Sequence, residues 1–345
     1  MKTPRALILT AFITAGFASS GFAEPAQPAS AYRVTGTYQV GGPGGWDYVT
    51  VDAANQLLYV PRSTHTQVIK ADTGAVVANI PGQKRNHGVA LAPAAHRGFI
   101  TDGGDASVTV FDLRTNQVLG KIKVLEDADG IAYDAATDKV LLVCGDASAM
   151  VVLSPDLDPV NGKPDAVIDL GGKPESFIVD GHGKAYVDLE DKDAIAVVDL
   201  KSLKVEARWP TTPGGAPVGL AIDVPHRRLF IGCRKPQNMV VMDCDTGKVL
   251  GVTPIGRGVD ACGFDDGFGF ASCGDGTLSV VGEDAPGHFA TVQSVATRPG
   301  ARTSAVDPLT HTVYLPTAEF FPAEGKARPK AKPGTFMIVK VGRAS

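Results

Sequence analysis

The sequence predicts an all-β protein, a seven-bladed β-propeller built from four-stranded antiparallel blades. Three observations carry this prediction. A hexamer with an apolar interior, most often ending in Asp, recurs seven times at intervals of 40 to 46 residues. Each copy is followed by further stretches typical of strands, separated by turn residues. The last repeat lacks one strand, and the N-terminal part of the chain carries a candidate for it. A strand-rich repeat of this length is typical of one propeller blade.

The composition agrees with a folded chain rich in turns. Hydrophobic residues make up 44% of the 345 residues and charged residues 20%, which is typical of a globular protein. The 40 glycines and 24 prolines indicate many tight turns between short strands.

The N-terminus, "MKTPRALILTAFITAGFASSGFAEPAQ", is typical of a secretory signal. Lys2 and Arg5 form its charged start, an apolar stretch follows, and small residues precede a predicted cut after Ala23. We therefore expect residues 1–23 to be a signal peptide, residues 24–31 a linker and residues 32–345 the propeller domain. The expected location is periplasmic or secreted, with no transmembrane segment in the mature chain.

Each repeat then supplies its strands in a fixed order. The predicted inner strands begin at residues 47, 87, 129, 175, 218, 260 and 302, for example in "DYVTVD", "DGIAYD" and "VGLAID". Second strands follow, such as "LLYVPR", "KAYVDL" and "VYLPTA". Third strands such as "NMVVMDCDTG" alternate apolar and polar residues and end in hairpin turn residues. A fourth, outer strand such as "KVLGVTPIG" completes the blade.

The seventh repeat offers only "TSAVDP", "HTVYLPTAE" and "GTFMIVKVG". The segment "YRVTGTYQV" at 32–40 is the available fourth strand. We expect this N-terminal strand to pair into the last blade, because closure of the ring removes exposed sheet edges.

The Tyr-Val-rich second strands, the turns of the form DxxTGxV and the terminal "TVYLPTAEF…KPGTFMIVKVG" resemble the YncE-like, or YVTN-repeat, propellers of bacterial exported compartments. The resemblance covers residues 32–343. It implies a periplasmic or secreted seven-bladed propeller that serves as a binding module. It does not supply an activity, because one fold carries many functions.

The repeat alignment also predicts the functional surface. First residues of the inner strands should ring one mouth of the central channel, and the ends of the second strands should approach the same face. We expect ligand contacts from the inner-strand residues Asp47, His87, Asp129, Glu175, Asp260 and Arg302, from the second-strand residues Arg62, Asp102 and Asp188, and from Trp46, which precedes the first inner strand. The inner ring is Asp47, His87, Asp129, Glu175, Val218, Asp260 and Arg302, and the second ring is Arg62, Asp102, Cys144, Asp188, Cys233, Cys273 and Thr317.

Four carboxylates in one ring repel one another. Two like charges about 7 Å apart cost about 2.4 kcal/mol at an effective dielectric constant near 20. Arg302, a protonated His87, raised carboxyl pKa values, solvent or a bound cation could offset this repulsion. Carboxylates with one imidazole suit calcium, manganese or zinc. The candidate metal ligands are His87, Asp129, Glu175 and Asp260.

Three functions are compatible with this surface. The first is a binding or scaffold module that takes an unknown protein or small molecule at the channel mouth. The second is a metal-dependent hydrolase of the lactonase type, with Asp129 or Glu175 as base for a metal-activated water. Propeller lactonases hold their cation with carboxylates and an amide, and the ring here has no Asn.

The third function is binding of single-stranded nucleic acid through a basic loop, "EGKARPKAKPG" at 324–334, which carries Lys326, Arg328, Lys330 and Lys332. The formal net charge of −4 disfavours a broad phosphate-binding surface. We expect a monomer. Five cysteines leave at least one thiol unpaired, and two pairings, Cys262 with Cys273 or with Cys233, remain open.

Overall fold

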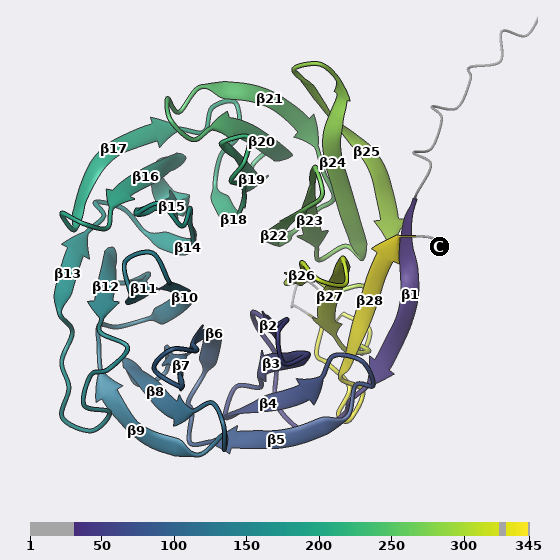
Figure 1. The fold of residues 1–345 in the computed structure, drawn as a ribbon. Helices are drawn as coiled ribbons and strands as arrows, with labels where there is room; N and C mark the ends of the chain where they lie inside the picture. The colour runs from purple at the N-terminus through teal and green to yellow at the C-terminus, as the bar shows by residue number, and fades with distance from the viewer. Residues whose placement is uncertain (1–30, 324–328, 344–345) are drawn as a thin grey trace, which may run out of the picture.

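A computed structural model describes residues 31–323 and 329–343, and these residues form a closed ring of seven four-stranded antiparallel sheets (Figure 1). The ring surrounds a central channel, with the inner strand of every blade facing it. The predicted fold class is confirmed. The predicted signal peptide and residues 24–30 of the predicted linker lie outside the described residues. None of the described helices is long and apolar enough to cross a membrane.

Every blade runs from an inner strand to an outer strand. Blades one and two comprise β2 (Thr50–Asp52), β3 (Leu57–Pro61), β4 (His65–Lys70), β5 (Val76–Pro81), β6 (Asn86–Ala92), β7 (Arg97–Asp102), β8 (Ser107–Asp112) and β9 (Val118–Lys123). Blades three and four comprise β10 (Ala128–Asp134), β11 (Lys139–Cys144), β12 (Ala149–Leu153), β13 (Ala166–Asp169), β14 (Pro174–Val179), β15 (Lys184–Leu189), β16 (Ala194–Asp199) and β17 (Lys204–Pro210), with a short 3-10 helix at Glu190–Lys192.

Blades five and six comprise β18 (Pro217–Asp223), β19 (Arg228–Arg234), β20 (Gln237–Asp243), β21 (Val249–Pro254), β22 (Val259–Asp265), β23 (Phe268–Cys273), β24 (Thr277–Ala285) and β25 (His288–Ala296). Blade seven comprises β26 (Ala305–Asp307), β27 (Thr312–Thr317), β28 (Met337–Arg343) and β1 (Tyr32–Gln39).

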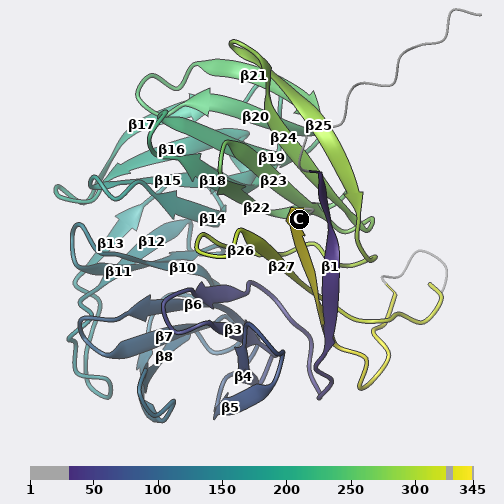
Figure 2. The ribbon, with the colours of Figure 1, turned by 45° about the vertical axis from the view of Figure 1, so that its right-hand side comes forward.

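The two ends of the chain close the ring within blade seven. β1 pairs antiparallel with β28, from Tyr32 opposite Arg343 to Gln39 opposite Met337. The predicted closure is confirmed. The hydroxyl of Tyr38 also donates to the carbonyls of Ala71 and Asp72 in blade one, at 2.8 and 2.6 Å. The closing strand is thus fixed to both of the blades that meet at the seam (Figures 1 and 2).

The hydrophobic core is divided among the blade interfaces. Each of the seven buried clusters combines side chains from two neighbouring blades. Phe99 and Val110 of blade two, for example, lie in one cluster with Leu142 of blade three, and all three are fully buried. Second and third strands carry most of these residues, because both faces of each sheet pack against a neighbour. This packing fixes the positions of the inner strands around the channel.

All five cysteines are unpaired. Cys262 lies opposite Ala271, and Cys273 lies opposite Val259, so these two thiols sit diagonally across adjacent strands. The structure therefore contains neither of the two pairings that the sequence left open.

Candidate functional site

A bulge at the start of the inner strand aims the ring side chains into the channel. In blades two to six the register between inner and second strands shifts at this point, and the ring position falls inside the shift. His87, for example, lies between Asn86, which pairs with Asp102, and Val89, which pairs with Ile100. A bulged residue leaves the ladder and can re-aim its side chain. In blades one and seven, Asp47 and Arg302 precede the first residue that pairs.

Hydroxyl side chains hold the ring backbone in place from the preceding blade. Thr101 of blade two donates to the carbonyl of Asp129 in blade three at 2.6 Å. Ser272 of blade six does the same for Arg302 at 2.8 Å, and Thr303 of blade seven for Asp47 at 3.0 Å. These three contacts fix neighbouring ring positions relative to one another. The sequence did not identify these hydroxyl residues, because their partners lie in the neighbouring blade, far away along the chain.

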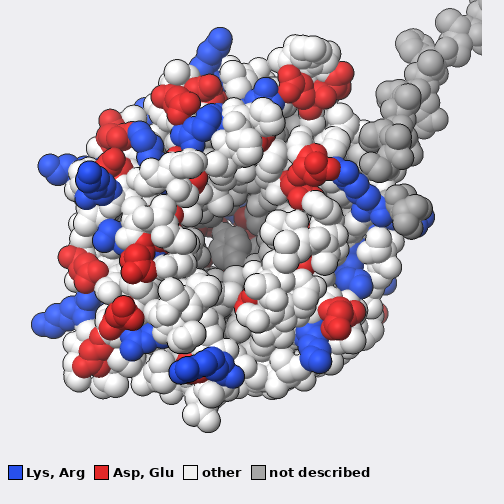
Figure 3. All heavy atoms as spheres, viewed as in Figure 1, with Lys and Arg blue, Asp and Glu red and all other residues white. Residues whose placement is uncertain are grey.

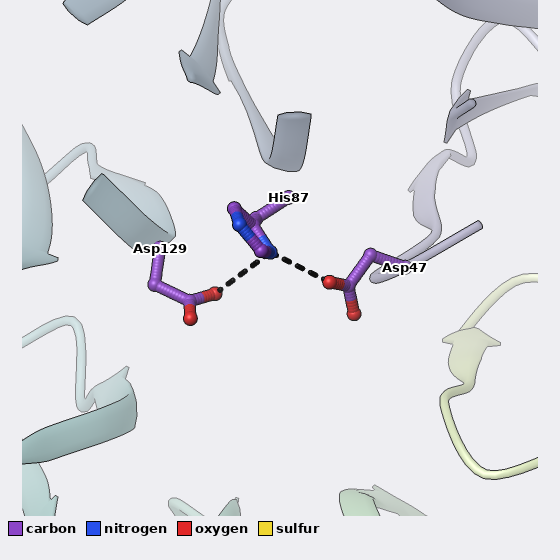
Figure 4. A group of neighbouring side chains, drawn as sticks. All are labelled: Asp47, His87 and Asp129. Carbon is purple, nitrogen blue, oxygen red and sulfur yellow. Dashed lines mark hydrogen bonds and ion pairs between the residues drawn. The ribbon is translucent and has the colours of Figure 1, made fainter. Parts of the chain in front are cut away.

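Three ring side chains from blades one, two and three converge on one point (Figure 4). The Nδ1 atom of His87 lies 2.7 Å from Oδ2 of Asp47 and 3.6 Å from Oδ1 of Asp129. All three side chains are largely buried, with 14 to 18% of their surface exposed. Their candidate ligand atoms lie within 4.8 Å of one another, so this group could hold a metal ion.

Two atoms of this group are buried without a hydrogen-bond partner among the described residues, Nε2 of His87 and Oδ1 of Asp129. Burying a polar atom without a partner costs about 1–3 kcal/mol. Oδ1 of Asp129 faces Nδ1 of His87, whereas Nε2 lies on the other side of the ring near Gly103. The group therefore has one unpartnered polar atom on each side of the imidazole, and that of Asp129 is on the side where the two carboxylates meet it.

The charges of the group perturb one another strongly. Burial disfavours the charged form of His87, but the hydrogen bond to Asp47 and the nearby charge of Asp129 outweigh burial, so the pKa of His87 is raised. Burial raises the pKa of Asp129 well above its ordinary value, against the opposing charge of His87. A protonated imidazole or a bound cation would each relieve the repulsion between the two carboxylates.

The remaining carboxylates of the ring form a second group around Arg234. Its Nη2 atom contacts Asp260 and lies 3.9 Å from Glu175, while Nη1 lies 3.4 Å from Glu190. Nε of Arg302 approaches Asp260 from the other side, at 2.8 Å. The structure therefore brings the predicted metal ligands His87 and Asp129 together with Asp47, and places Glu175 and Asp260 with arginines instead.

Arg234 was not among the residues that the sequence nominated, and neither was Tyr48. Arg234 is the last residue of β19, the second strand of blade five, and the ring residue of that blade is the buried Val218. An apolar ring residue leaves room for a long neighbour, which is the signal that could have identified Arg234. Tyr48 lines a channel cavity of about 250 Å³. Burial and the charges of the surrounding carboxylates, Asp129 first, raise the pKa of Tyr48 well above its ordinary value, so its hydroxyl stays protonated.

The second ring lies inside the blades and not on the mouth surface. All seven of its positions are fully buried: Arg62, Asp102, Cys144, Asp188, Cys233, Cys273 and Thr317. The ends of the second strands are enclosed by the third strands, which is why these side chains do not reach the channel. Arg62, Asp102 and Asp188 were predicted to contact a ligand. They lie inside the blades instead and support the site from there.

Each of these three residues has a defined supporting role. Asp188 accepts hydrogen bonds from the backbone N–H groups of Glu175 and Ser176, at 2.9 and 2.8 Å, and so braces the bulge of blade four. Asp102 accepts one from the N–H of Lys84 at 3.1 Å. Arg62 donates to four carbonyls of the glycine-rich loop at residues 41–45 and lies 3.7 Å from the ring centroid of Phe336.

Trp46 packs against blade seven and also lines a cavity at the channel mouth. Its ring packs on Phe336 and Phe320 of blade seven, at centroid distances of 5.7 and 6.0 Å, and covers the gap between blades seven and one. It also lines a cavity of about 710 Å³ together with Phe320, Phe321 and the two arginines Arg234 and Arg302. This mouth cavity borders the group around Asp260.

The basic loop is described only in part. Lys326 and Arg328 lie outside the described residues. Lys332 is paired with Glu319 at 3.1 Å, and the yellow segment between β27 and β28 projects from the ring (Figure 2). On the face shown in Figure 3, acidic and basic side chains are interspersed around the outer rim, and mainly uncharged residues border the central hollow. That face carries no continuous basic track among the residues drawn in colour.

Comparisons with known proteins establish the fold alone. No family model matches the chain, and no curated protein matches it. Among solved structures, the chain is similar to a chain of Kuenenia stuttgartiensis hydrazine synthase, with a TM-score of 0.68 and 13% identity over 79% of this chain and 92% of that one. At this identity the similarity indicates a shared propeller architecture, and the function must be argued from the site.

Proposed function

We propose that this chain is an exported binding protein, resembling the YncE-like propellers, that takes a small ligand at the channel mouth with the help of a divalent cation. Asp47, His87 and Asp129 hold the cation. The single observation that carries this proposal is the position of His87 Nδ1 between two carboxylate oxygens, at 2.7 and 3.6 Å. The signal-like N-terminus supports a periplasmic or secreted location, and we propose that the protein acts there as a monomer.

The charge balance favours a cation at this point. Two ionised carboxylates and a neutral imidazole carry two negative charges, which one divalent ion neutralises. The buried oxygen of Asp129 that lacks a partner would gain one. Three protein ligands leave further coordination positions for ligand atoms, as in metal sites that bind or activate small molecules. Zinc and manganese accept this mixed nitrogen and oxygen set, and calcium would require more oxygen atoms from solvent or ligand.

The experiment is calorimetric titration of zinc, manganese and calcium chloride into the mature protein after chelator treatment, combined with elemental analysis of the protein as purified. We expect one equivalent of at least one cation to bind the wild type and none to bind His87→Ala or Asp129→Asn. His226→Ala is the matched control, because His226 forms a similar pair with Asp223 at 2.9 Å on an exposed turn. Absence of binding by all three cations would refute the cation site.

The hydrolase of the lactonase type is the second candidate, and the same group favours it because its three ligands leave coordination positions open. A cation there would lower the pKa of a bound water. Of the two remaining ring carboxylates, Asp260 is paired with both Arg234 and Arg302, so Glu175 is the one that could take its proton, with Arg234 at 3.9 Å from it. A panel of lactones tested with each cation decides the matter. A metal-stimulated rate that Glu175→Gln abolishes would support hydrolysis, and the lack of any such rate would leave the binding role.

A further inference from the structure

We infer that the mouth cavity between blades five, six, seven and one is a binding site for an organic carboxylate with a flat, aromatic body. The inference rests on the proposed ligand-binding role of the mouth but not on the proposed cation. The cavity measures about 710 Å³, which is large enough for a bicyclic acid. It differs from the channel cavity in its lining, which combines aromatic rings with guanidinium groups.

The aromatic wall offers apolar surface that no described residue covers. Trp46 and Phe320 stand edge to face at 6.0 Å, and the neighbouring Phe321 leaves 50% of its surface exposed. Gly258 and Gly274 also line the cavity and bring only backbone to its surface. A flat ring in this cavity could therefore contact both exposed backbone and aromatic side chains. Burial of apolar area contributes about 25 cal/mol per Å² to such binding.

The charged end of the cavity selects an anion. Asp260 is held between Arg234 and Arg302, and Arg234 also faces Glu190 and Glu175, so Arg302 is the lining cation that an anion can approach. Each nitrogen of Arg234 is already engaged, because Nε donates to the carbonyl of Val259 and Nη1 contacts the carboxylate of Glu190, while Nη2 contacts Asp260. The guanidinium of Arg302 makes a single interaction among the described residues, which is the ion pair of its Nε with Asp260.

The terminal nitrogens of Arg302 are therefore the donors available to a ligand, and 38% of this side chain is exposed. A guanidinium whose Nε is already fixed presents its terminal N–H groups in a defined direction, as carboxylate recognition requires. A carboxylate suits this site better than a phosphate dianion, because Glu190 and Glu175 lie close to Arg234 and would repel a second negative charge. The ligand class that fits both ends is an aromatic carboxylate.

The probe is 2-naphthoate, titrated into the mature, chelator-treated protein by calorimetry, with 2-naphthamide as its neutral counterpart. We expect saturable 1:1 binding of 2-naphthoate. Arg302→Gln should raise the Kd for 2-naphthoate about tenfold and leave the Kd for 2-naphthamide unchanged. Arg33→Gln, which makes the same charge change on the exposed strand β1, is the matched control and should change neither value.

Phe321→Ala tests the aromatic wall with a residue whose exposure makes it dispensable for folding. It should weaken both probes about fivefold. Leu309→Ala, which removes an even more exposed apolar side chain outside the cavity lining, should change neither. No saturable binding of 2-naphthoate, or an unchanged Kd in Arg302→Gln, would overturn the inference. Tighter binding of adenosine monophosphate than of 2-naphthoate would overturn the carboxylate assignment.

His87→Ala separates this inference from the proposed cation site. It should abolish cation binding and leave binding of 2-naphthoate to the chelator-treated protein unchanged. A protein that binds 2-naphthoate but no cation would refute the cation site alone. A protein that binds a cation but not 2-naphthoate would refute the aromatic carboxylate alone.

Discussion

Replacement of Arg62 by Met should destabilise the fold and loosen the loop that carries Trp46 and Asp47. Arg62 is fully buried without a carboxylate partner among the described residues. Burial lowers the pKa of its guanidinium to about 10, so it remains charged at neutral pH. Its partners are Gln67 and the carbonyls of Gly41, Gly42, Gly44 and Gly45, at 2.8 to 3.3 Å for the four carbonyls.

The magnitude follows from these contacts. Hydrogen bonds to a charged group contribute about 1.5–3 kcal/mol each, so five of them sum to roughly 7–15 kcal/mol before the cost of burying the charge. That cost is several kcal/mol for one ion. Because the carbonyls belong to a partly exposed loop, water can satisfy them in the variant. We therefore expect Arg62→Met to lower the free energy of unfolding by about 3 kcal/mol.

Urea unfolding followed by tryptophan fluorescence measures this loss. Arg62→Lys keeps the charge but not the planar set of N–H donors. It should lower the free energy of unfolding less than Arg62→Met does. The loosened loop should also weaken cation binding through Asp47. If Arg62→Met unfolds within about 0.5 kcal/mol of the wild type, the hydrogen bonds do not hold the loop and the assignment of Arg62 as its organiser fails.

Three further predictions address other parts of the molecule. Burial raises the pKa of Asp188 to about 7; its contribution to stability is thus fully present at acidic pH and lost as pH rises through about 7. Relative to the wild type, the free energy of unfolding of Asp188→Asn should therefore rise by about 2 kcal/mol between pH 5 and pH 8. The same difference between variant and wild type at both pH values, measured by urea unfolding, would contradict this. A Cβ atom at Gly74, which has φ of +75°, would lie 2.3 Å from the ring of Tyr38. Gly74→Ala should lower the free energy of unfolding by about 2 kcal/mol through strain at the seam of the ring, whereas Gly82→Ala, at φ of +92° with open space, should cost only about 1 kcal/mol. A cation that binds the proposed site should stabilise the wild type by about 2.7 kcal/mol at a hundred times its Kd, and His87→Ala should show no shift in Tm.

The number of blades, the order of strands and the closure of the ring were predictable from the sequence. A repeat near 42 residues with alternating strands fixes the blade as a unit, and the missing strand of the seventh repeat pairs with Tyr32–Gln39 as expected. The inner ring was also predictable. Position within a repeat determines position along a strand, and six of the seven ring positions carry polar side chains at the channel, whereas Val218 of blade five is buried in the core between blades five and six.

Contacts across the ring were not predictable in the same way. The repeat alignment assigned Asp47, Asp129, Glu175 and Asp260 to one ring but carried no information on side-chain reach or pairing. The structure divides them: His87 joins Asp47 and Asp129, and Arg234 extends across the buried Val218 to reach Glu175 and Asp260. This division could not be read from spacing, because an ion pair depends on where a long side chain ends and not on where its backbone begins.

The burial of the second-ring side chains was also determined by the tertiary structure and not by the sequence pattern. The sequence placed Arg62, Asp102 and Asp188 at strand ends that approach the mouth, but the third strands and neighbouring blades enclose them completely. A polar residue at a strand end can face water or the interior. Which of the two holds depends on the packing of segments that are distant along the chain, and the sequence period is the same in both cases.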